Sequence, residues 1–174
     1  GAPDIVKTQG TANASIATAI SLTGAFDLRT DSSIASSTTI PHATVTATTH
    51  GGVEFYAITV TAGETVIFDI DGATFDSTLR LYTAAGDELA NNDDNNGDGG
   101  SATDSMLTHT FAAAGTYYIQ VAQWVSNVGQ TFTSGAPAAG QTYKLNVSSP
   151  SQTPVAIALV GWTLNGDAGA DTLT

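Results

Sequence analysis

The stretch between Asn91 and Ser105 is unusually rich in oxygen atoms that can bind a metal ion. It reads NNDDNNGDGGSATDS, with four aspartates, four asparagines, three glycines and no cation. Calcium takes about six to eight oxygen ligands from carboxylates, amide carbonyls, backbone carbonyls and water. Glycine lets the backbone wrap closely around an ion. The spacing differs from that of an EF-hand loop, so the composition predicts a calcium site of another kind, whereas magnesium binds fewer protein ligands.

Further carboxylates are expected beside this loop. In TVIFDID the apolar residues alternate with polar ones, which places Asp69 and Asp71 together on the outward face of a strand. A hairpin formed by the residues that follow Asp76 would return the chain to Asp93 and Asp94. The alternative is a solvated acidic loop that only keeps the protein soluble. The predicted calcium ligands are Asp69, Asp71, Asp76, Asp93, Asp94, Asp98 and Asp104.

A second candidate site lies in residues 123–141, the longest predicted loop. Function in sandwich proteins concentrates in loops, and aromatic rings provide platforms for sugars or peptides. We therefore expect Trp124, Phe132 and Asn127 to contact a ligand, with Tyr82 and Tyr56 as further aromatics on or near outward faces. The alternative is that Trp124 closes one end of a sandwich and Phe132 covers an edge strand.

The elements that must position these residues are predicted to be strands. Six segments alternate with period two and are rich in β-branched and aromatic residues. They are Val53–Val60, Thr65–Asp71, Ser77–Thr83, Ser105–Phe111, Thr116–Ala122 and Thr142–Ser148. Turn signals such as TAGE, AAGD and AAAGT separate them, and only ANASIATAI has a helical pattern. Short strands with one apolar face predict an all-β fold, an antiparallel β-sandwich.

Composition narrows the class of protein. The 174 residues include 16 acids against 4 lysines and arginines, for a formal charge of −12. Nucleic acid and anionic membranes are therefore unsuitable partners. No cysteine is present, and no apolar run reaches the roughly 18 residues of a membrane span. The chain shows no signal peptide and opens GAPD without methionine, so we expect a piece of a longer, secreted protein.

No catalytic motif is recognisable. The three histidines form neither an H-x-x-x-H nor an H-E-x-x-H zinc motif, and no G-x-S-x-G elbow occurs. Asp69 and Asp71 share one strand face rather than facing each other across a cleft, as a glycosidase pair would. We therefore expect a protein that is not an enzyme.

The order of several short motifs resembles a known family. VEFYAITVTAGETVIFDIDGATFDSTLRLYTAAGDELANNDD followed by DSMLTHTFAAAGTYYIQV is similar to the bacterial pre-peptidase C-terminal domain family, over about residues 53–121. The resemblance implies a non-catalytic, jelly-roll-like β-sandwich carried by secreted enzymes or surface proteins. Its relatives among the collagen-binding modules bind protein and are stabilised by calcium. Carried over by motif, Asp76, Asp93, Asp94 and Asp104 would be metal ligands. The chain departs from the family at Glu54, where an Asp-x-Asp pattern is common.

The end of the chain carries a second resemblance. GDAGADTLT is similar to one nonapeptide of the calcium-binding repeats-in-toxin proteins. The resemblance implies that a repeat array begins at residues 165–174, after a linker strand at 154–164. Proteins with that layout resemble large type I-secreted bacterial adhesins.

These observations predict one monomeric, calcium-stabilised sandwich over residues 1–153. The predicted function is calcium-dependent adhesion outside the cell, at a cell surface, through a peptide or protein partner. Two alternatives stay open: a carbohydrate-binding module of a secreted hydrolase that recognises glycan, and a spacer domain with no ligand.

Overall fold

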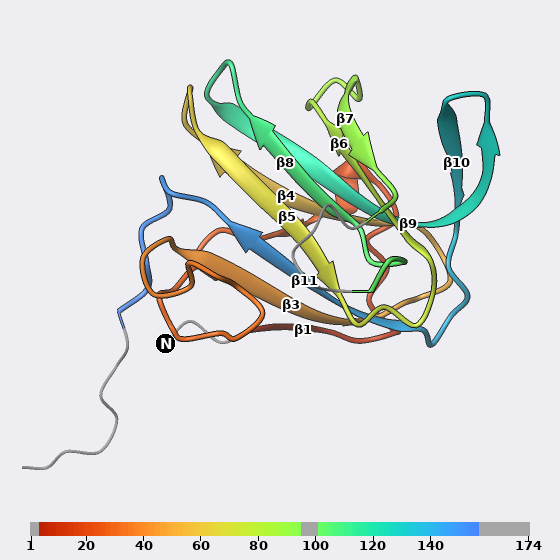
Figure 1. Cartoon of the computed structure of the whole chain (residues 1–174). Helices are drawn as coiled ribbons and strands as arrows, with labels where there is room; N and C mark the ends of the chain where they lie inside the picture. The colour runs from red at the N-terminus through yellow and green to blue at the C-terminus, as the bar shows by residue number, and fades with distance from the viewer. Residues whose placement is uncertain (1–3, 95–100, 157–174) are drawn as a thin grey trace, which may run out of the picture.

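The structure is a computed structural model that describes residues 4–94 and 101–156. Two β-sheets pack face to face (Figure 1), and the prediction of an all-β sandwich is confirmed. One sheet has the order β1 (Ile5–Lys7), β3 (His42–Thr48), β11 (Thr142–Ser148), β5 (Thr65–Asp71) and β8 (Met106–Thr110). The other has the order β2 (Ile20–Ser21), β4 (Glu54–Val60), β9 (Gly115–Val128), β6 (Ser77–Tyr82) and β7 (Glu88–Asn92), and β10 (Thr131–Gly135) pairs with β9.

The strands pair as a set of nested hairpins. From the innermost pair outward, the chain joins β6 to β7, β5 to β8, β4 to β9 and β3 to β11, all antiparallel. Two further antiparallel pairings, of β11 with β5 and of β6 with β9, roll this long hairpin into two four-stranded layers. An eight-stranded double sheet of this kind is a jelly roll.

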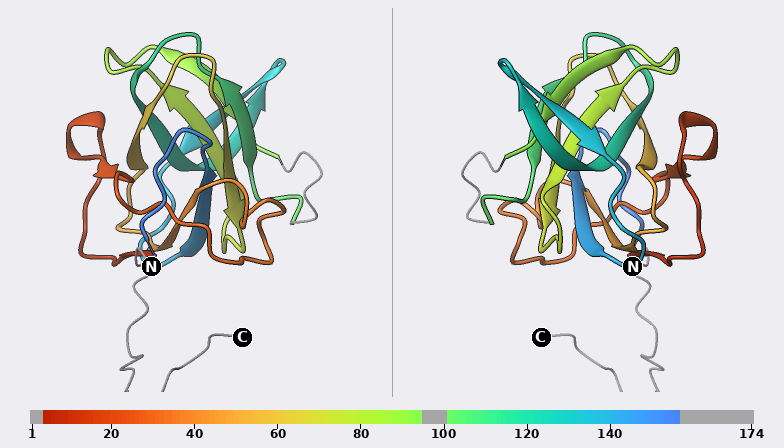
Figure 2. Two further views of the ribbon diagram at one scale, coloured as in Figure 1. Left: turned by 90° about the vertical axis from the view of Figure 1, so that its left-hand side faces the viewer. Right: turned by 90° about the vertical axis from the view of Figure 1, so that its right-hand side faces the viewer.

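Parallel edge strands extend both sheets beyond the predicted antiparallel pattern. β1 lies parallel to β3, and β2 lies parallel to β4. The segment expected to be helical instead forms a single 3-10 turn, η1 (Ile16–Thr18), immediately before β2. This red segment stands out from one side of the sandwich in both views of Figure 2. Among the described residues there is no α-helix, and none of their segments is a helix able to cross a membrane.

The apolar face of each strand fills the space between the sheets. Burying each large apolar side chain stabilises the fold by about 1.5–3 kcal/mol. Fully buried examples from both layers are Phe68, Ile70, Leu145, Tyr56, Leu79, Leu81 and Ile119. Tyr56, expected near an outward face, is 0% exposed because it shares the inward face of β4 with Ile58 and Val60.

A charged network crosses the core at one end of the sandwich. The Lys7 ammonium on β1 is 2.5 Å from Glu54 Oε1 on β4, and both side chains are 0% exposed. The Tyr143 hydroxyl donates to Glu54 Oε2 at 2.5 Å, and the Tyr56 hydroxyl lies 2.6 Å from that of Tyr143. His50 also bonds Glu54 through its backbone amide at 3.1 Å. Burial raises the pKa of both tyrosines, which keeps the phenols neutral.

A second buried carboxylate fastens the segment that leaves β11. Glu64, in the turn between β4 and β5, accepts hydrogen bonds from the hydroxyls of Ser149 and Ser151 and from the amides of Thr61 and Ser151. Burial opposes ionisation of Glu64, but these hydrogen bonds outweigh it and lower its pKa. Beyond this point the Val155 amide donates to the Phe26 carbonyl at 2.8 Å. The boundary at residue 153 and the linker strand stay predictions, and residues 157–174, with the proposed repeat, lie outside the described residues.

Candidate functional site: an acidic strand end and an aromatic hairpin

Three of the predicted calcium ligands meet at one end of the six-stranded sheet. Asp76 directly precedes β6, and Asp93 and Asp94 directly follow β7. Because β6 and β7 are antiparallel, the start of one lies beside the end of the other, with Leu79 opposite Asn92. The expected hairpin therefore brings Asp76 back to Asp93 and Asp94.

The electrostatics of these three carboxylates reflect their proximity. Burial, followed by the negative charges of Asp94 and Asp93, raises the pKa of Asp76. Burial and the charge of Asp94 raise the pKa of Asp93, against smaller opposing effects of a backbone hydrogen bond and Arg80. Like charges at short range disfavour ionisation, so a cation bound here would relieve a repulsion that the fold itself creates.

Asn92 shapes the backbone on which two of these aspartates sit, and sequence reasoning did not single it out. Its side-chain oxygen accepts from the amides of Asp93 and Asp94, at 2.9 and 3.3 Å. Its side-chain amide donates to the carbonyls of Asp94 and Met106. Asparagine side chains commonly form hydrogen bonds with the backbone of the residues that follow them. The position of Asn92, at the end of a strand and directly before two aspartates, could have indicated this role.

Asp104 lies apart from this group and has a role in the fold. It is 3% exposed, and its two carboxylate oxygens accept from the amides of Gly72 and Ala73 at 2.9 and 3.1 Å. The next residue, Ser105, donates its hydroxyl to the Ser77 carbonyl at 2.6 Å. The two Asp-Ser motifs thus pair through their serines, while the Asp104 carboxylate is directed to the turn after β5.

The remaining predicted ligands are separated as well. Asp69 and Asp71 lie on the outer face of the five-stranded sheet, as the alternation predicts. Asp69 is only 8% exposed, because it lines a cavity closed by residues 33–36. Asp71 accepts from the Asn146 side-chain amide at 2.7 Å. Asp98 lies outside the described residues.

The donor chemistry at Asp76, Asp93 and Asp94 suits calcium, since every candidate ligand is a hard oxygen atom. Over residues 4–94 and 101–156, however, no group of three or more histidine, aspartate and glutamate side chains has the arrangement of a metal site. The carboxylates of Asp76, Asp93 and Asp94 therefore do not form a complete metal site by themselves. An ion at this strand end would need further oxygen atoms.

The predicted loop at residues 123–141 is largely a hairpin. β9 continues to Val128, two residues turn the chain, and β10 returns alongside it. Gly129 adopts a φ of +65°, which a tight turn between two strands requires and which glycine adopts without strain. In Figure 1 this hairpin stands beside β6 and β7.

The three predicted ligand-binding residues share one face of this hairpin. Phe132 pairs directly with Asn127, and Ser134 pairs with Trp124. Cross-strand partners point to the same side of a sheet, and the Trp124 indole nitrogen lies 3.4 Å from Asn127 Oδ1. Residues of the opposite face are Ser126, Val128, Thr131 and Thr133.

Arg80 on β6 fastens this face of the hairpin to the sheet. Its guanidinium lies 4.4 Å from the centre of the Phe132 ring and donates to the Phe132 carbonyl at 2.8 Å. It also bonds Ser134 Oγ at 3.2 Å and Glu88 at 2.9 Å. Trp124 and Phe132 are both half-buried, so each ring keeps part of its surface open to solvent.

Comparison with known proteins finds a family match over part of the chain. The family model of the bacterial pre-peptidase C-terminal domain matches residues 52–123, which is less than half of the chain. This range runs from β4 into β9 and includes every predicted calcium ligand. The resemblance read from the motifs is therefore confirmed for this segment, whereas the match does not reach residues 165–174.

A curated relative matches a stretch of similar length. A probable subtilase-type serine protease of Deinococcus radiodurans is 38% identical over 74 residues, which is 40% of this chain and 10% of the relative. The chain thus spans about a tenth of that protein's length. Among solved structures, the Aeromonas hydrophila PliG, a periplasmic inhibitor of g-type lysozyme, aligns over 84% of this chain and 99% of its own, with a TM-score of 0.44 and 16% identity.

Proposed function

We propose that this chain is a non-catalytic accessory module of a secreted bacterial protein, and that it binds an extended segment of a protein partner. The binding surface is the face of the β9–β10 hairpin that carries Trp124, Asn127 and Phe132. The single observation that carries this proposal is that one strand pairing gathers all three side chains.

The chemistry of this face suits a peptide. Aromatic rings offer apolar area at low conformational cost, and the Asn127 amide adds donors and an acceptor for a peptide backbone. Arg80 holds the Phe132 ring in place, so little side-chain entropy is lost when a ligand packs on it. Tyr82, at the end of β6, offers a further half-buried ring on the same sheet.

Calcium is the proposed cofactor, with Asp76, Asp93 and Asp94 as its ligands. The pKa values of Asp76 and Asp93 are both raised, by burial and then by neighbouring carboxylates, which supports this assignment. A divalent cation would replace the repulsion among the three carboxylates by attraction. Its contribution is to hold the strand end together and thereby to stabilise the module.

An extracellular or periplasmic location is part of the proposal. The match of residues 52–123 to a domain family named for peptidases, and the similarity of part of the chain to a probable subtilase-type protease, support a role beside a secreted enzyme. Attachment to a cell surface, adhesion and a repeat array at the end of the chain remain finer expectations of the same kind.

Binding to immobilised peptides tests the proposal. A library of extended peptides is screened with the wild-type chain, and the best binder is titrated against variants. Removing a central aromatic anchor commonly costs 2 kcal/mol or more, about 30-fold in affinity. We expect a loss near that size for Trp124→Ala and a smaller loss for Asn127→Ala, which removes hydrogen bonds rather than an aromatic anchor. Val128→Ala, on the opposite face of the hairpin, leaves the affinity within about twofold.

A glycan array read in parallel separates the alternatives. Binding to glycans alone, with the same dependence on Trp124, would replace the peptide by a carbohydrate. Absence of binding to both arrays, in calcium and in chelator, would leave a spacer domain and overturn the proposal.

A further inference from the structure

A row of polar residues crosses the outer face of the five-stranded sheet, on the side of the molecule away from the hairpin. Thr46 on β3, Lys144 on β11 and Asp71 on β5 are register partners. Their neighbours Val45, Leu145 and Ile70 are 0–1% exposed and point into the core. Since side chains alternate along a strand, the row faces outward.

Lys144 has a position that no other cation of the chain shares. Lys7 is paired with Glu54, Arg29 with Asp4 and Asp27, and Arg80 with Glu88. The sequence contains only four lysines and arginines, which are Lys7, Arg29, Arg80 and Lys144. Within the part of the chain that the structure describes, no carboxylate comes within ion-pair distance of the Lys144 ammonium.

Asp71 is the nearest acid to Lys144 in the strand register and stands directly opposite it. The Asp71 carboxylate accepts a hydrogen bond from Asn146 at 2.7 Å. The charge of Lys144 acts at longer range on Asp31. Burial would raise the pKa of Asp31, but hydrogen bonds from Ser33 and the positive charge of Lys144 lower it.

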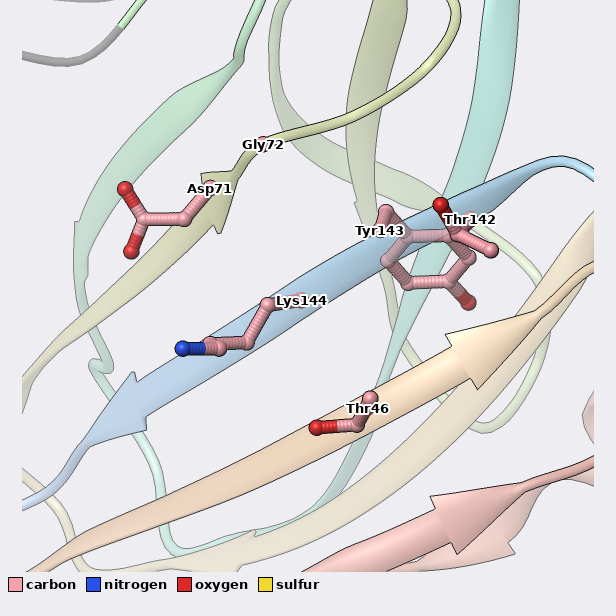
Figure 3. Close-up of a pocket in the computed structure, with 6 residues that line it drawn as sticks. All are labelled: Thr46, Asp71, Gly72, Thr142, Tyr143 and Lys144. Atoms are coloured by element: carbon pink, nitrogen blue, oxygen red, sulfur yellow. The ribbon is translucent and has the colours of Figure 1, made fainter.

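The row borders a concave surface. Thr46, Asp71, Gly72, Thr142, Tyr143 and Lys144 line a pocket of about 280 Å³. Figure 3 shows Asp71, Lys144 and Thr46 on three neighbouring strands, with Thr142 farther along β11. The exposed Thr46 and Thr142 add hydroxyl groups, and Val6, register partner of Thr46, is 73% exposed at the edge of the row.

We propose that this pocket is a second ligand site, which takes the side chains of an extended peptide carrying an acidic residue and a basic residue two positions apart. The acidic side chain bonds the Lys144 ammonium, and the basic side chain approaches Asp71. The peptide class of the ligand rests on the proposed function, but the site does not use the hairpin or calcium.

The spacing and the charge both favour such a peptide. Neighbouring strands lie about 4.8 Å apart, and residues two apart in an extended chain lie about 6.6 Å apart on one face. Two long side chains can close that difference. The net charge of −12 repels a polyanion such as a polyuronate, whereas a peptide with balanced charges meets a positive and a negative group in one pocket.

Fluorescent hexapeptides provide the test. One contains the acid-x-base pattern, a second keeps the composition but separates the charges, a third carries only the acid, and a tri-glucuronate is the sugar arm. Anisotropy titrations use the wild-type chain and the variants Lys144→Gln, Asp71→Asn and Trp124→Ala. Thr108→Ala, an exposed position of β8 on the same outer face, is the matched control.

The variants are expected to change the affinities for the peptides in different ways. Lys144→Gln weakens the acid-x-base peptide by up to about fivefold, the upper range for an exposed ion pair. Asp71→Asn also weakens that peptide but strengthens the acid-only peptide, because a competing negative charge is gone. Trp124→Ala and Thr108→Ala leave all affinities within about twofold, and raising the salt concentration reduces the difference between wild type and Lys144→Gln.

Three results would overturn the site. Equal affinity of wild type and Lys144→Gln for every probe would show that the ammonium binds none of them. Preference for the tri-glucuronate over the patterned peptide would assign the pocket to acidic sugars instead. Loss of the patterned peptide in Trp124→Ala but not in Lys144→Gln would transfer the binding to the hairpin, which is the surface of the proposed function.

Discussion

Two groups of charged residues in this molecule have opposite electrostatic arrangements. Around Glu54, a fully buried carboxylate is matched by the Lys7 ammonium, the Tyr143 hydroxyl and a backbone amide. Where β6 begins and β7 ends, burial and the negative charges of neighbouring aspartates raise the pKa values of Asp76 and Asp93.

The two groups differ in whether their charges are paired within the chain. A buried ion has to be paired because desolvation costs several kcal/mol, so the Glu54 group is complete within the chain and joins the two sheets. The aspartate group is less buried, and among the described residues none of its three carboxylates forms an ion pair. The fold therefore tolerates repulsion there, with only a minor opposing effect of the Arg80 charge on Asp93. The Glu54 group serves the fold, whereas the aspartate group is the one for which we propose a calcium ion from outside.

The largest effect is expected from breaking the complete group. Glu54→Gln leaves the Lys7 ammonium buried without a negative partner, and such a loss commonly costs about 3–5 kcal/mol. Urea denaturation should show a loss of that size in the free energy of unfolding. The double variant Lys7→Met/Glu54→Gln, which removes both charges, should be less damaging than Glu54→Gln alone; an equal or greater loss would contradict the ion-pair explanation.

Binding of calcium to Asp76, Asp93 and Asp94 should give the next largest effect on stability. Calcium at about 100 times its Kd adds roughly 2.7 kcal/mol for one site that binds only the folded state, so the melting temperature should rise on calcium addition. Asp94→Ala removes most of this rise. Asp87→Ala, an acid in the exposed turn between β6 and β7, does not. Identical melting in calcium and in chelator would refute the metal site.

A substitution at Asp104 tests whether this carboxylate stabilises the fold or binds calcium. Asp104→Asn replaces one of the two oxygens that accept from Gly72 and Ala73 by a donor, and an unsatisfied buried amide costs about 1–3 kcal/mol. Thermal melts should show this loss equally with calcium and with chelator. A loss seen only in calcium would make Asp104 a metal ligand, as the family resemblance implied.

The smallest effect concerns pH in the absence of metal. Because the pKa of Asp76 is raised in the folded state above its ordinary 3.8, ionisation of this carboxyl reduces stability as the pH rises through that folded value. In chelator, Asp76→Asn should therefore gain on the order of 0.5 kcal/mol at pH 7 after solvent screening. The gain should disappear below the ordinary aspartate range. A gain that persisted at low pH would mean that it does not come from charge.

The strands that could be predicted are those with large apolar residues at every second position. β5 and β11 match the predicted ranges, and β4 and β6 differ by one residue. β3 was missed because its inward residues are Ala43, Val45 and Ala47, which give little apolar contrast with the threonines between them. β1 and β2 carry two or three residues each and depend on a parallel neighbour far along the chain, for which no local pattern exists.

The candidate site was predictable to the extent that it follows from hairpins. Pairing of β6 with β7 brings Asp76 to Asp93 and Asp94, which sequence spacing alone can suggest. The use of Asp104 depends on where two amides point after β5, and the Lys7–Glu54 pair joins residues 47 positions apart. Neither leaves a periodic signal. The β9–β10 hairpin did leave a local signal, the glycine directly after Val128. This turn was missed because residues 123–141 were interpreted as one long loop.

The nested pairing also sets an order in which the chain can become a folded domain. β11 lies between β3 and β5 and pairs with both, with Thr142 opposite Thr48. A nascent chain that ends before residue 142 leaves a gap in the middle of the five-stranded sheet, with two strand edges exposed. Closure over so long a loop is entropically slow. Until its last strand arrives, this module should remain a substrate for chaperones and proteases.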